Sequence, residues 1–346
     1  MLSAGTIYFL CPDVAEATGG VTKIYEFALA LSSAGYSVAV VHQDPGYRPS
    51  WISINVRIVD AKNTVVGLND LLVVPEFMSK LLSQLSGCAK VVLNQNSFSP
   101  GLIGSYDEDV CAIISTSEYI SRQAAFCYPE KKNFSIKLGY DHNIFRISES
   151  NKKRQIAYMP RRRSGDSRNI LQALERRGSL KGWSVTAIDK LSFHQVAGVL
   201  RESMIFLSFS QREGFGLPPL EAMASGCLVV GFHGIGGAEF FDQSYCYPIP
   251  EDDICLFQET LEGLLLNPNI EAICKSKGWI AACAVSQKYT MQMQDADIVN
   301  AFGCIALLAT GVKNRRPVPL RSISFEPNRF KLSARFVKKA AIALLS

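Results

Sequence analysis

The chain has 346 residues, a length that suits two domains of roughly 150 residues each. Hydrophobic residues make up 48% of the chain and charged residues 19%, a globular balance that argues against extended disorder. The net charge of +5 is modest, and the basic runs lack interleaved aromatic residues or a recognised nucleic-acid-binding module. We therefore expect no nucleic-acid partner.

No targeting or membrane-spanning segment is expected. The first residues lack the basic start and the cleavage site of a signal peptide, and the longest apolar runs have only the length of strands. These features predict a cytoplasmic protein. The ten cysteines are scattered and form no Cys-x-x-Cys pair, which predicts buried reduced thiols rather than disulfides or zinc ligands.

In the first half of the chain, apolar runs of strand length alternate with segments of helical periodicity. The strands are expected at 6–11, 36–42, 55–60, 71–74, 90–94 and 111–116, and the helices at 21–34, 77–85 and 118–126. Strands that alternate with helices predict a parallel sheet covered on both faces.

The same alternation starts again after a polar link at 148–153. Strands are expected at 154–159, 183–188, 204–210 and 227–232, helices at 169–177 and 193–202, and mostly helix from 268 to 309. The sequence therefore predicts two doubly wound α/β domains, at 1–150 and 151–310, followed by a basic tail at 311–346.

The most informative segment is 212–226, which follows the strand expected at 204–210 and leads into a helix. Gly214 and Gly216 allow the backbone to approach a ligand closely. Pro218 suits the first helical position, and the free N–H groups at a helix start favour an anion. The turn is therefore a predicted phosphate site.

Two carboxylates flank this turn. Glu213 lies before the helix and Glu221 about one turn inside it, so they would lie on either side of a phosphate rather than pair with each other. Such carboxylates suit the hydroxyls on the two sides of a diphosphate, a sugar on one side and a ribose on the other.

With these residues in place, the chain resembles the retaining glycosyltransferases of glycosyltransferase family 4, which have the GT-B fold of two Rossmann-like domains across a cleft. The resemblance spans about residues 5–305 and rests on four features in the family's order. They are Gly19 and Gly20 after the first strand, 137–141 with Phe145 at the domain link, 161–163 before a helix, and the 213–221 stretch with 236–239 after it.

The resemblance implies roles for individual residues. Glu213 would hold sugar hydroxyls near the reacting carbon, Glu221 the ribose hydroxyls, and the Gly216 and Leu217 amides the distal phosphate. The donor-binding set that it implies is Gly19, Gly20, Arg161, Gly214, Phe215, Gly216, Leu217 and Glu221.

The basic segment departs slightly from the family pattern. Arg162 and Arg168 keep the family's six-residue spacing, with Arg in place of Lys, and together with Glu213 they are the candidate catalytic residues. Which of Arg161, Arg162 and Arg163 contacts the diphosphate stays open at this point.

A second departure lies in the first domain. Where many family members have a His after a strand, this chain has Asn94, Gln95 and Asn96. Amides hydrogen-bond a sugar or an acceptor but take no proton, so we assign these three residues to acceptor or sugar binding.

The resemblance implies retaining transfer of a sugar from a nucleotide-diphosphate sugar to an acceptor hydroxyl, without a metal or another cofactor. The acceptor would be a glycan or a lipid-linked glycan of cell-surface polysaccharide or glycolipid synthesis. Two alternatives are a sugar-nucleotide epimerase of the same fold and a non-catalytic glycan- or nucleotide-binding subunit.

Three further features each have two interpretations. Asp107 and Asp109 fit an Asp-x-Asp metal pattern or a solvated acidic loop, and Glu239 fits a site residue or a helix N-terminal carboxylate. The segment 328–346 fits a basic amphipathic helix at the inner face of a membrane, or a helix that packs on the first domain.

Overall fold

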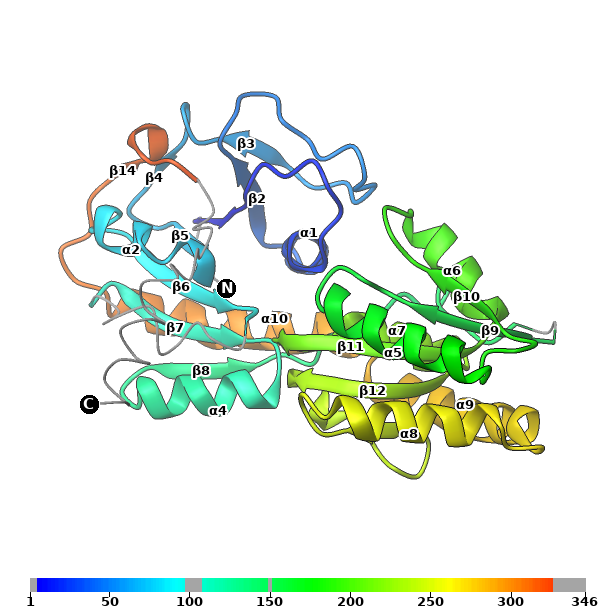
Figure 1. Cartoon of the computed structure of the whole chain (residues 1–346). Helices are drawn as coiled ribbons and strands as arrows, with labels where there is room; N and C mark the ends of the chain where they lie inside the picture. Colours follow the sequence, from blue (N-terminus) through cyan, green and yellow to red (C-terminus); the bar gives the residue numbers. More distant parts are fainter. Residues whose placement is uncertain (1–4, 97–107, 149–150, 326–346) are drawn as a thin grey trace, which may run out of the picture.

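The computed structural model describes residues 5–96, 108–148 and 151–325, which form two α/β domains side by side (Figure 1). Each domain is a parallel sheet with helices on both faces, as the alternating apolar runs predict. The predicted fold class of two doubly wound domains is confirmed.

The first domain has a seven-stranded parallel sheet in the order β3-β2-β1-β5-β6-β7-β8. Its strands are β1 (Thr6–Leu10), β2 (Ser37–His42), β3 (Ile58–Asp60), β5 (Leu71–Pro75), β6 (Ala89–Asn94), β7 (Val110–Ser115) and β8 (Lys132–Ser135). Ile7 and Phe9 of β1 belong to a core that includes α1 (Gly19–Ser33) and α10 (Met291–Thr310). Tyr8 and Leu10 face the opposite core, with α2 (Leu81–Gln84) and α4 (Glu118–Cys127).

The second domain has a five-stranded parallel sheet in the order β10-β9-β11-β12-β13. Its strands are β9 (Lys153–Tyr158), β10 (Ser184–Ala187), β11 (Ser203–Glu213), β12 (Leu228–Ile235) and β13 (Tyr247–Ile249). Helices α6 (Phe193–Glu202), α7 (Leu217–Ala224) and α9 (Ile270–Lys288) share a core with Phe206 of β11. Helices α5 (Ser164–Arg177) and α8 (Ile254–Leu265) cover the other face.

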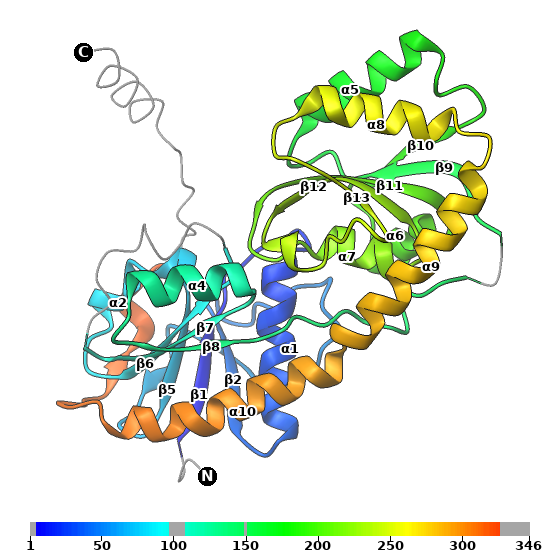
Figure 2. The same ribbon diagram turned by 90° about the horizontal axis from the view of Figure 1, so that it is seen from below.

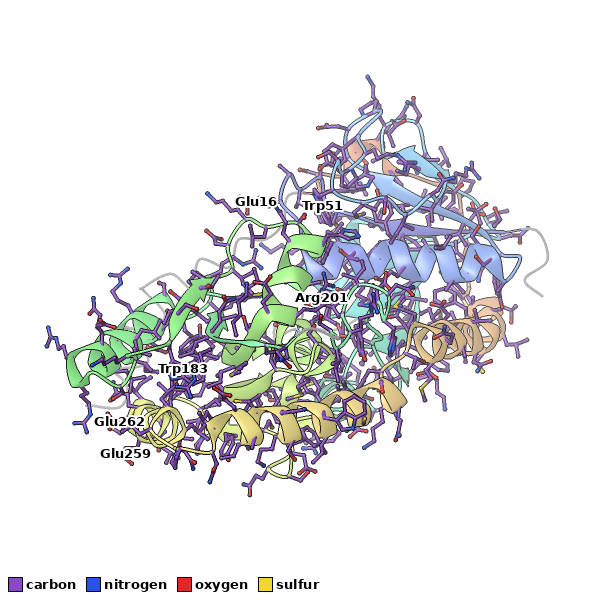
Figure 3. All side chains as sticks on the ribbon, turned by 90° about the vertical axis from the view of Figure 1, so that its right-hand side faces the viewer. Glu16, Trp51, Trp183, Arg201, Glu259 and Glu262 are labelled. Atoms are coloured by element: carbon purple, nitrogen blue, oxygen red, sulfur yellow. The ribbon has the colours of Figure 1, made fainter. Side chains whose placement is uncertain are left out.

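On that outer side the end of α5 is joined to α8. Arg177 Nε donates to Glu262 of α8 (2.6 Å), and Figure 3 shows Glu262 beside Glu259.

The chain returns to the first domain through α10. Figure 2 shows α9 and α10 running one after the other from the second domain to the first. Thr290 caps α10 by accepting a hydrogen bond from the Met293 N–H (3.0 Å), and Phe302 of α10 packs against Phe9 with ring centroids 6.0 Å apart. Helix α10, which lies within the segment 151–310 predicted as the second domain, therefore packs on the first-domain sheet.

The segment after α10 also lies on the first domain. Strand β14 (Val318–Pro319) pairs antiparallel with β4 (Val65–Val66), and the turn η3 (Leu320–Ser322) follows it. Leu320 and Phe325 belong to the core on the α2 and α4 side of the sheet. The basic segment 328–346 is outside the described residues.

A buried lysine joins three segments at the junction of the domains. Lys23 of α1 is 3% exposed, and its ammonium donates to the Gly139 carbonyl (2.6 Å), to Gln294 of α10 (3.0 Å) and to Glu26 (2.6 Å). Gln294 in turn accepts from the Gly139 N–H (3.0 Å) and donates to Glu26 (3.0 Å). Since each buried polar group has a partner, this cluster fixes the domain link against α1 and α10.

The other sequence predictions meet mixed outcomes. The helix predicted at 77–85 is instead the short turn η1 (Glu76–Met78) and α2. All ten cysteines are free thiols, but Cys127, Cys255 and Cys304 are exposed rather than buried. Across the described ranges, no helix has both the length and the apolar character to cross a membrane.

If α10 completes the core of the first domain, truncating its buried face should destabilise the protein strongly. We expect Phe302→Ala to lower the free energy of unfolding by about 3–5 kcal/mol in denaturant titration. The control Leu307→Ala changes a residue of the same helix that is 75% exposed, so it should have little effect. Equal effects of the two variants would contradict this packing.

Candidate functional site

Two adjoining cavities lie where the carboxyl ends of the two sheets face each other. The β11 cavity extends along β11 at 206–210 and past Ile188 and Phe193 of the second domain. The β6 cavity lies toward the first domain and reaches Glu76 and Gln95. Both cavities are lined by Thr18, Gly19, Arg161, Arg162, Glu213, Leu217 and Pro218. These shared residues form the common wall of the two cavities and include Gly19, Arg161 and Leu217 of the predicted donor set.

The turn between β11 and α7 begins with a contact between the domains. Glu213 forms an antiparallel bridge with Asn96 of the first domain. A Cβ atom at the next residue, Gly214, would overlap the Gln95 carbonyl oxygen and lie 2.9 Å from Ile120 Cδ1. Glycine is therefore needed at 214 because the two backbones touch there, a contact that lies between two domains and that the sequence does not reveal.

The start of α7 has few amide donors. Gly216 is the N-cap residue with φ 97°, a conformation that residues with a side chain rarely adopt. The helix begins at Leu217, so Pro218 is the second helical residue, whereas the sequence predicted it to be the first. Pro218 and Pro219 have no N–H. The donors that remain ahead of the two prolines are the Gly216 and Leu217 amides, and both residues line the β6 cavity.

The structure brings Arg162 and Glu213 together. Arg162 Nε lies 2.8 Å from Glu213 Oε1, and Arg162 Nη2 lies 3.4 Å from Oε2. The Arg162 side chain is 55% exposed, so the pair is accessible at the common wall. Without a ligand, each of these two side chains neutralises the other.

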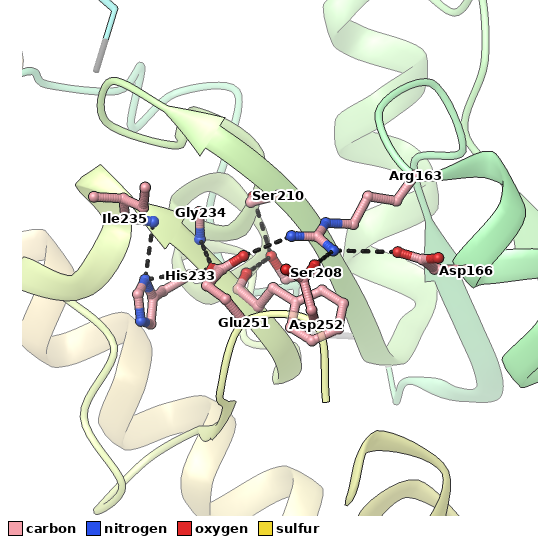
Figure 4. Close-up of polar contacts among 10 residues, drawn as sticks. Arg163, Asp166, Ser208, Ser210, His233, Gly234, Ile235, Glu251 and Asp252 are labelled. Carbon is pink, nitrogen blue, oxygen red and sulfur yellow. Dashed lines mark hydrogen bonds and ion pairs between the residues drawn. The ribbon is translucent and has the colours of Figure 1, made fainter. Parts of the chain in front are cut away.

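The neighbouring arginines differ in environment. Arg161 is exposed at the common wall, whereas the Arg163 side chain is 5% exposed and binds Asp166, Glu251 (2.6 Å) and Asp252 (Figure 4). The Arg163 guanidinium also stacks over Phe232, 4.4 Å from the ring centroid. Arg163 is thus bound within the second domain, which leaves Arg161 and Arg162 facing the cavities. Arg168 is exposed on α5 and lines neither cavity.

The Arg163 cluster supports the second half of the site. Glu251 accepts from Arg163 with one oxygen and from the Gly234 N–H (2.9 Å) with the other, which holds the end of β12 (Figure 4). The turn η2 (Gly236–Glu239) follows. Its Glu239 accepts from the Glu118 N–H at the start of α4 (3.0 Å), and burial raises the pKa of Glu239 to about 7. The helix that Glu239 caps belongs to the opposite domain, so this carboxylate also joins the domains.

Glu221 is buried beside the junction of the domains. It is 9% exposed and lines the β11 cavity. Burial raises the pKa of Glu221 to about 8; the Lys23 ammonium opposes this rise and the Glu26 carboxylate adds to it. At this position next to an apolar cavity, the Glu221 carboxyl group can accept hydrogen bonds from the hydroxyls of a ligand.

The other predicted residues lie on both sides of the cleft. Gly19 and Gly20 begin α1 and line the β6 cavity, as do Phe215, Gln95 and Asn96. Asn94 lies behind them: its side chain is fully buried, lines neither cavity, and has no hydrogen-bond partner within the described part of the chain.

Sequence reasoning missed Glu76. This carboxylate follows β5 directly, lines the β6 cavity and is 5% exposed. The signal was present, since an acidic residue immediately after a buried parallel strand lies at the ligand-binding edge of such a sheet.

The acidic loop is partly described. Asp109 accepts hydrogen bonds from the Gly87 N–H (2.7 Å) and from Lys90 (3.4 Å), so it binds groups of its own domain. Asp107 is outside the described residues. Among the residues that the structure covers, no group of three His, Cys, Asp or Glu side chains is arranged to hold a metal ion.

Comparisons with known proteins identify the fold. Residues 181–278 match the family model described as glycosyl transferases group 1. The alpha-1,6-glucosyltransferase of Actinobacillus pleuropneumoniae serotype 7 (strain AP76) is 40% identical over 94 residues, which cover 24% of this chain and 28% of that protein. The chain thus matches less than a third of the length of this relative.

Two solved structures are similar over most of the chain. Sucrose-phosphate synthase from Thermosynechococcus elongatus aligns with a TM-score of 0.62 at 13% identity, covering 87% of this chain and 99% of that one. S. aureus TarM in complex with fondaparinux, alpha-GlcNAc-glycerol and UDP aligns with a TM-score of 0.52 at 14% identity, covering 68% of this chain and 56% of that one. At these identities the likeness concerns the fold, which is the GT-B arrangement.

The contact at Gly214 makes a steric prediction. Gly214→Ala should force the two domains apart at the cleft and lower the free energy of unfolding by about 1–3 kcal/mol, measured by denaturant titration. The control Gly263→Ala adds a methyl group on α8 where no atom lies within 4 Å, so it should be neutral or stabilising. Equal stability of Gly214→Ala and the parent would rule out this close approach.

The environment of Glu221 predicts a dependence on pH. The folded protein holds this proton more tightly than the unfolded chain, where the carboxyl titrates near pH 4.5. Its contribution to stability is therefore fully present below about pH 4.5 and is lost as the pH rises through about 8. Glu221→Gln removes the ionisation, so its Tm relative to the parent should rise between about pH 5 and about pH 9. Glu259→Gln on the exposed face of α8 is the control, and a Tm difference independent of pH would refute the raised pKa.

Proposed function

We propose that the protein is a retaining glycosyltransferase that moves a sugar from a nucleotide-diphosphate sugar to an acceptor hydroxyl. The observation that carries this proposal is the common wall of the two cavities. Arg161, Arg162, Glu213 and Leu217 lie there between two Rossmann-like domains, with Gly216 on the β6-cavity side and Glu221 on the β11-cavity side.

The nucleoside of the donor would occupy the β11 cavity. Its walls are largely apolar, formed by Ile188, Leu191 and Phe193, and Glu221 lies among them as a partner for the ribose hydroxyls. UDP is the first nucleotide to test because the similar TarM structure contains UDP. Glucose is the first sugar to test because the relative from Actinobacillus pleuropneumoniae is a glucosyltransferase.

The diphosphate would bind at the common wall. Arg161, Arg162 and the two amides can neutralise the charge that builds on the leaving diphosphate, which is where most of the barrier would be lowered. In this scheme a phosphate oxygen competes with Glu213 for the Arg162 guanidinium. Glu213 is then released to accept hydrogen bonds from the sugar hydroxyls. Arg168 keeps its predicted role only if α5 moves toward the cleft when the donor binds.

Retention of configuration would follow from substitution on one face of the sugar. The acceptor hydroxyl attacks the anomeric carbon from the side that the diphosphate leaves, and a phosphate oxygen takes the hydroxyl proton. Two arginines and two amides supply the positive charge in this scheme, so we infer that the reaction needs no metal. The acceptor would be a glycan or lipid-linked glycan.

The donor site is tested first by binding. A thermal-shift panel of UDP, GDP, ADP and UDP-glucose in the presence of EDTA should give a positive shift with one base. Glu221→Ala should abolish that shift, whereas the control Glu259→Ala on α8 should retain it. No shift with any nucleotide for the parent would overturn the donor site and favour a glycan-binding subunit.

The role of Arg162 is tested by steady-state kinetics. Arg162→Ala should lower kcat by about 10²–10³ with little change in nucleotide affinity, because its charge is needed most as the diphosphate leaves. Arg176→Ala, an exposed residue on α5, is the control. Release of nucleoside diphosphate is the measurement, and product analysis distinguishes transfer from epimerisation, which returns an altered nucleotide sugar without an acceptor. Parent-like kcat in Arg162→Ala would exclude this role.

A further inference from the structure

Glu76 lies at the centre of the edge of the first-domain sheet that faces the second domain. It follows β5, which pairs with β1 on one side and with β6 on the other. Pro75 is in register with Leu93 of β6, so Glu76 lies beside the Asn94–Asn96 segment that meets the second domain at Glu213.

The Glu76 carboxylate is buried and accepts hydrogen bonds from backbone N–H groups. Glu76 is 5% exposed, and its Oε2 accepts the Gln95 N–H (3.1 Å). Within the described residues it forms no ion pair, although Arg161, Arg162 and Lys23 line the same cavity. Burial raises the pKa of Glu76 to about 7, and the Gln95 N–H limits this rise. Burying a carboxyl group without a cation lowers the stability of the folded state, so packing alone does not explain a glutamate at this position.

Two neighbouring side-chain amides have atoms without a hydrogen-bond partner among the described residues. Gln95 Nε2 is buried and makes no hydrogen bond to any described residue, and both polar side-chain atoms of Asn94 are unpaired in the same way. Thr116 and Phe77 complete this side of the β6 cavity. A carboxylate, an amide donor and an aromatic ring together match the hydroxyls and the C–H face of a sugar.

The position separates this group from the donor residues. Glu76 lines the β6 cavity but not the β11 cavity, whereas Glu221 lines the β11 cavity but not the β6 cavity. Glu213 lies between them on the common wall. A ligand at Glu76 would therefore approach the common wall from the side opposite to the nucleoside.

We propose that Glu76 is an acceptor-binding residue, which accepts a hydrogen bond from a hydroxyl of an acceptor sugar in the β6 cavity, with Gln95 donating to the same ring. This inference rests on the proposed function, since it assigns the acceptor side of that site. It replaces the uncharged acceptor site predicted from Asn94, Gln95 and Asn96 by one that contains a carboxyl group.

Glucose is the probe for this site. Binding is measured by saturation-transfer NMR in a glucose titration with UDP present, on the full chain. The parent should bind glucose, and Glu76→Ala should weaken binding about tenfold or more because one hydrogen bond to a charged group is lost. Glu76→Gln keeps the shape and should bind with intermediate affinity. Glu130→Ala, an exposed Glu of the same domain, should behave as the parent.

Thermal shift with UDP on the same samples separates the two proposals. An unchanged UDP shift in Glu76→Ala, together with lost glucose binding, supports the acceptor role. If Glu76→Ala does not fold, Glu76→Gln carries the test. Parent-like glucose affinity in the Glu76 variants, or no glucose binding by the parent, overturns the role of Glu76. If UDP does not raise the Tm of the parent, the proposed donor site is wrong instead. The glucose titration is then repeated without UDP to test the role of Glu76.

Discussion

The backbone contact between Asn96 and Glu213 is the constraint on which the site depends. It joins the end of β6 in one domain to the end of β11 in the other, and it is possible because Gly214 has no side chain to meet Gln95. Through this contact the first-domain edge and the start of α7 share one wall between two cavities. The Lys23 cluster and the return of α10 hold the domains in the orientation that this contact requires.

Three carboxyl groups, two of them buried and one partly buried, surround this junction, and burial raises the pKa of each. Glu221 borders the β11 cavity, Glu76 borders the β6 cavity, and Glu239 caps a helix of the opposite domain. A nucleotide-sugar donor needs cations at its diphosphate. On either side of the diphosphate it needs groups that accept hydrogen bonds from the ribose and sugar hydroxyls. Arg161 and Arg162 lie at the common wall, where Glu213 pairs with Arg162, and Glu221 and Glu76 lie on opposite sides of it, which matches that division.

Local features of the sequence predicted the fold and the turn that leads into α7. Strand periodicity predicted both parallel sheets, and the glycines and prolines at 214–219 predicted the turn before α7. Contacts between residues far apart in the chain could not be predicted from the sequence. Nothing near Arg163 indicates that Glu251 and Asp252 hold it away from the cavities, nothing in α10 indicates which domain it covers, and the Arg162 pair with Glu213 joins two separate motifs.

The most direct test of the donor site is a crystal structure of the protein with UDP. The diphosphate should lie within hydrogen-bond distance of the Gly216 and Leu217 amides and of Arg161 or Arg162, with the uridine in the β11 cavity beside Glu221. The Arg162 pair with Glu213 should be open. UDP bound elsewhere, with that pair intact, would contradict the assignment of the common wall to the diphosphate.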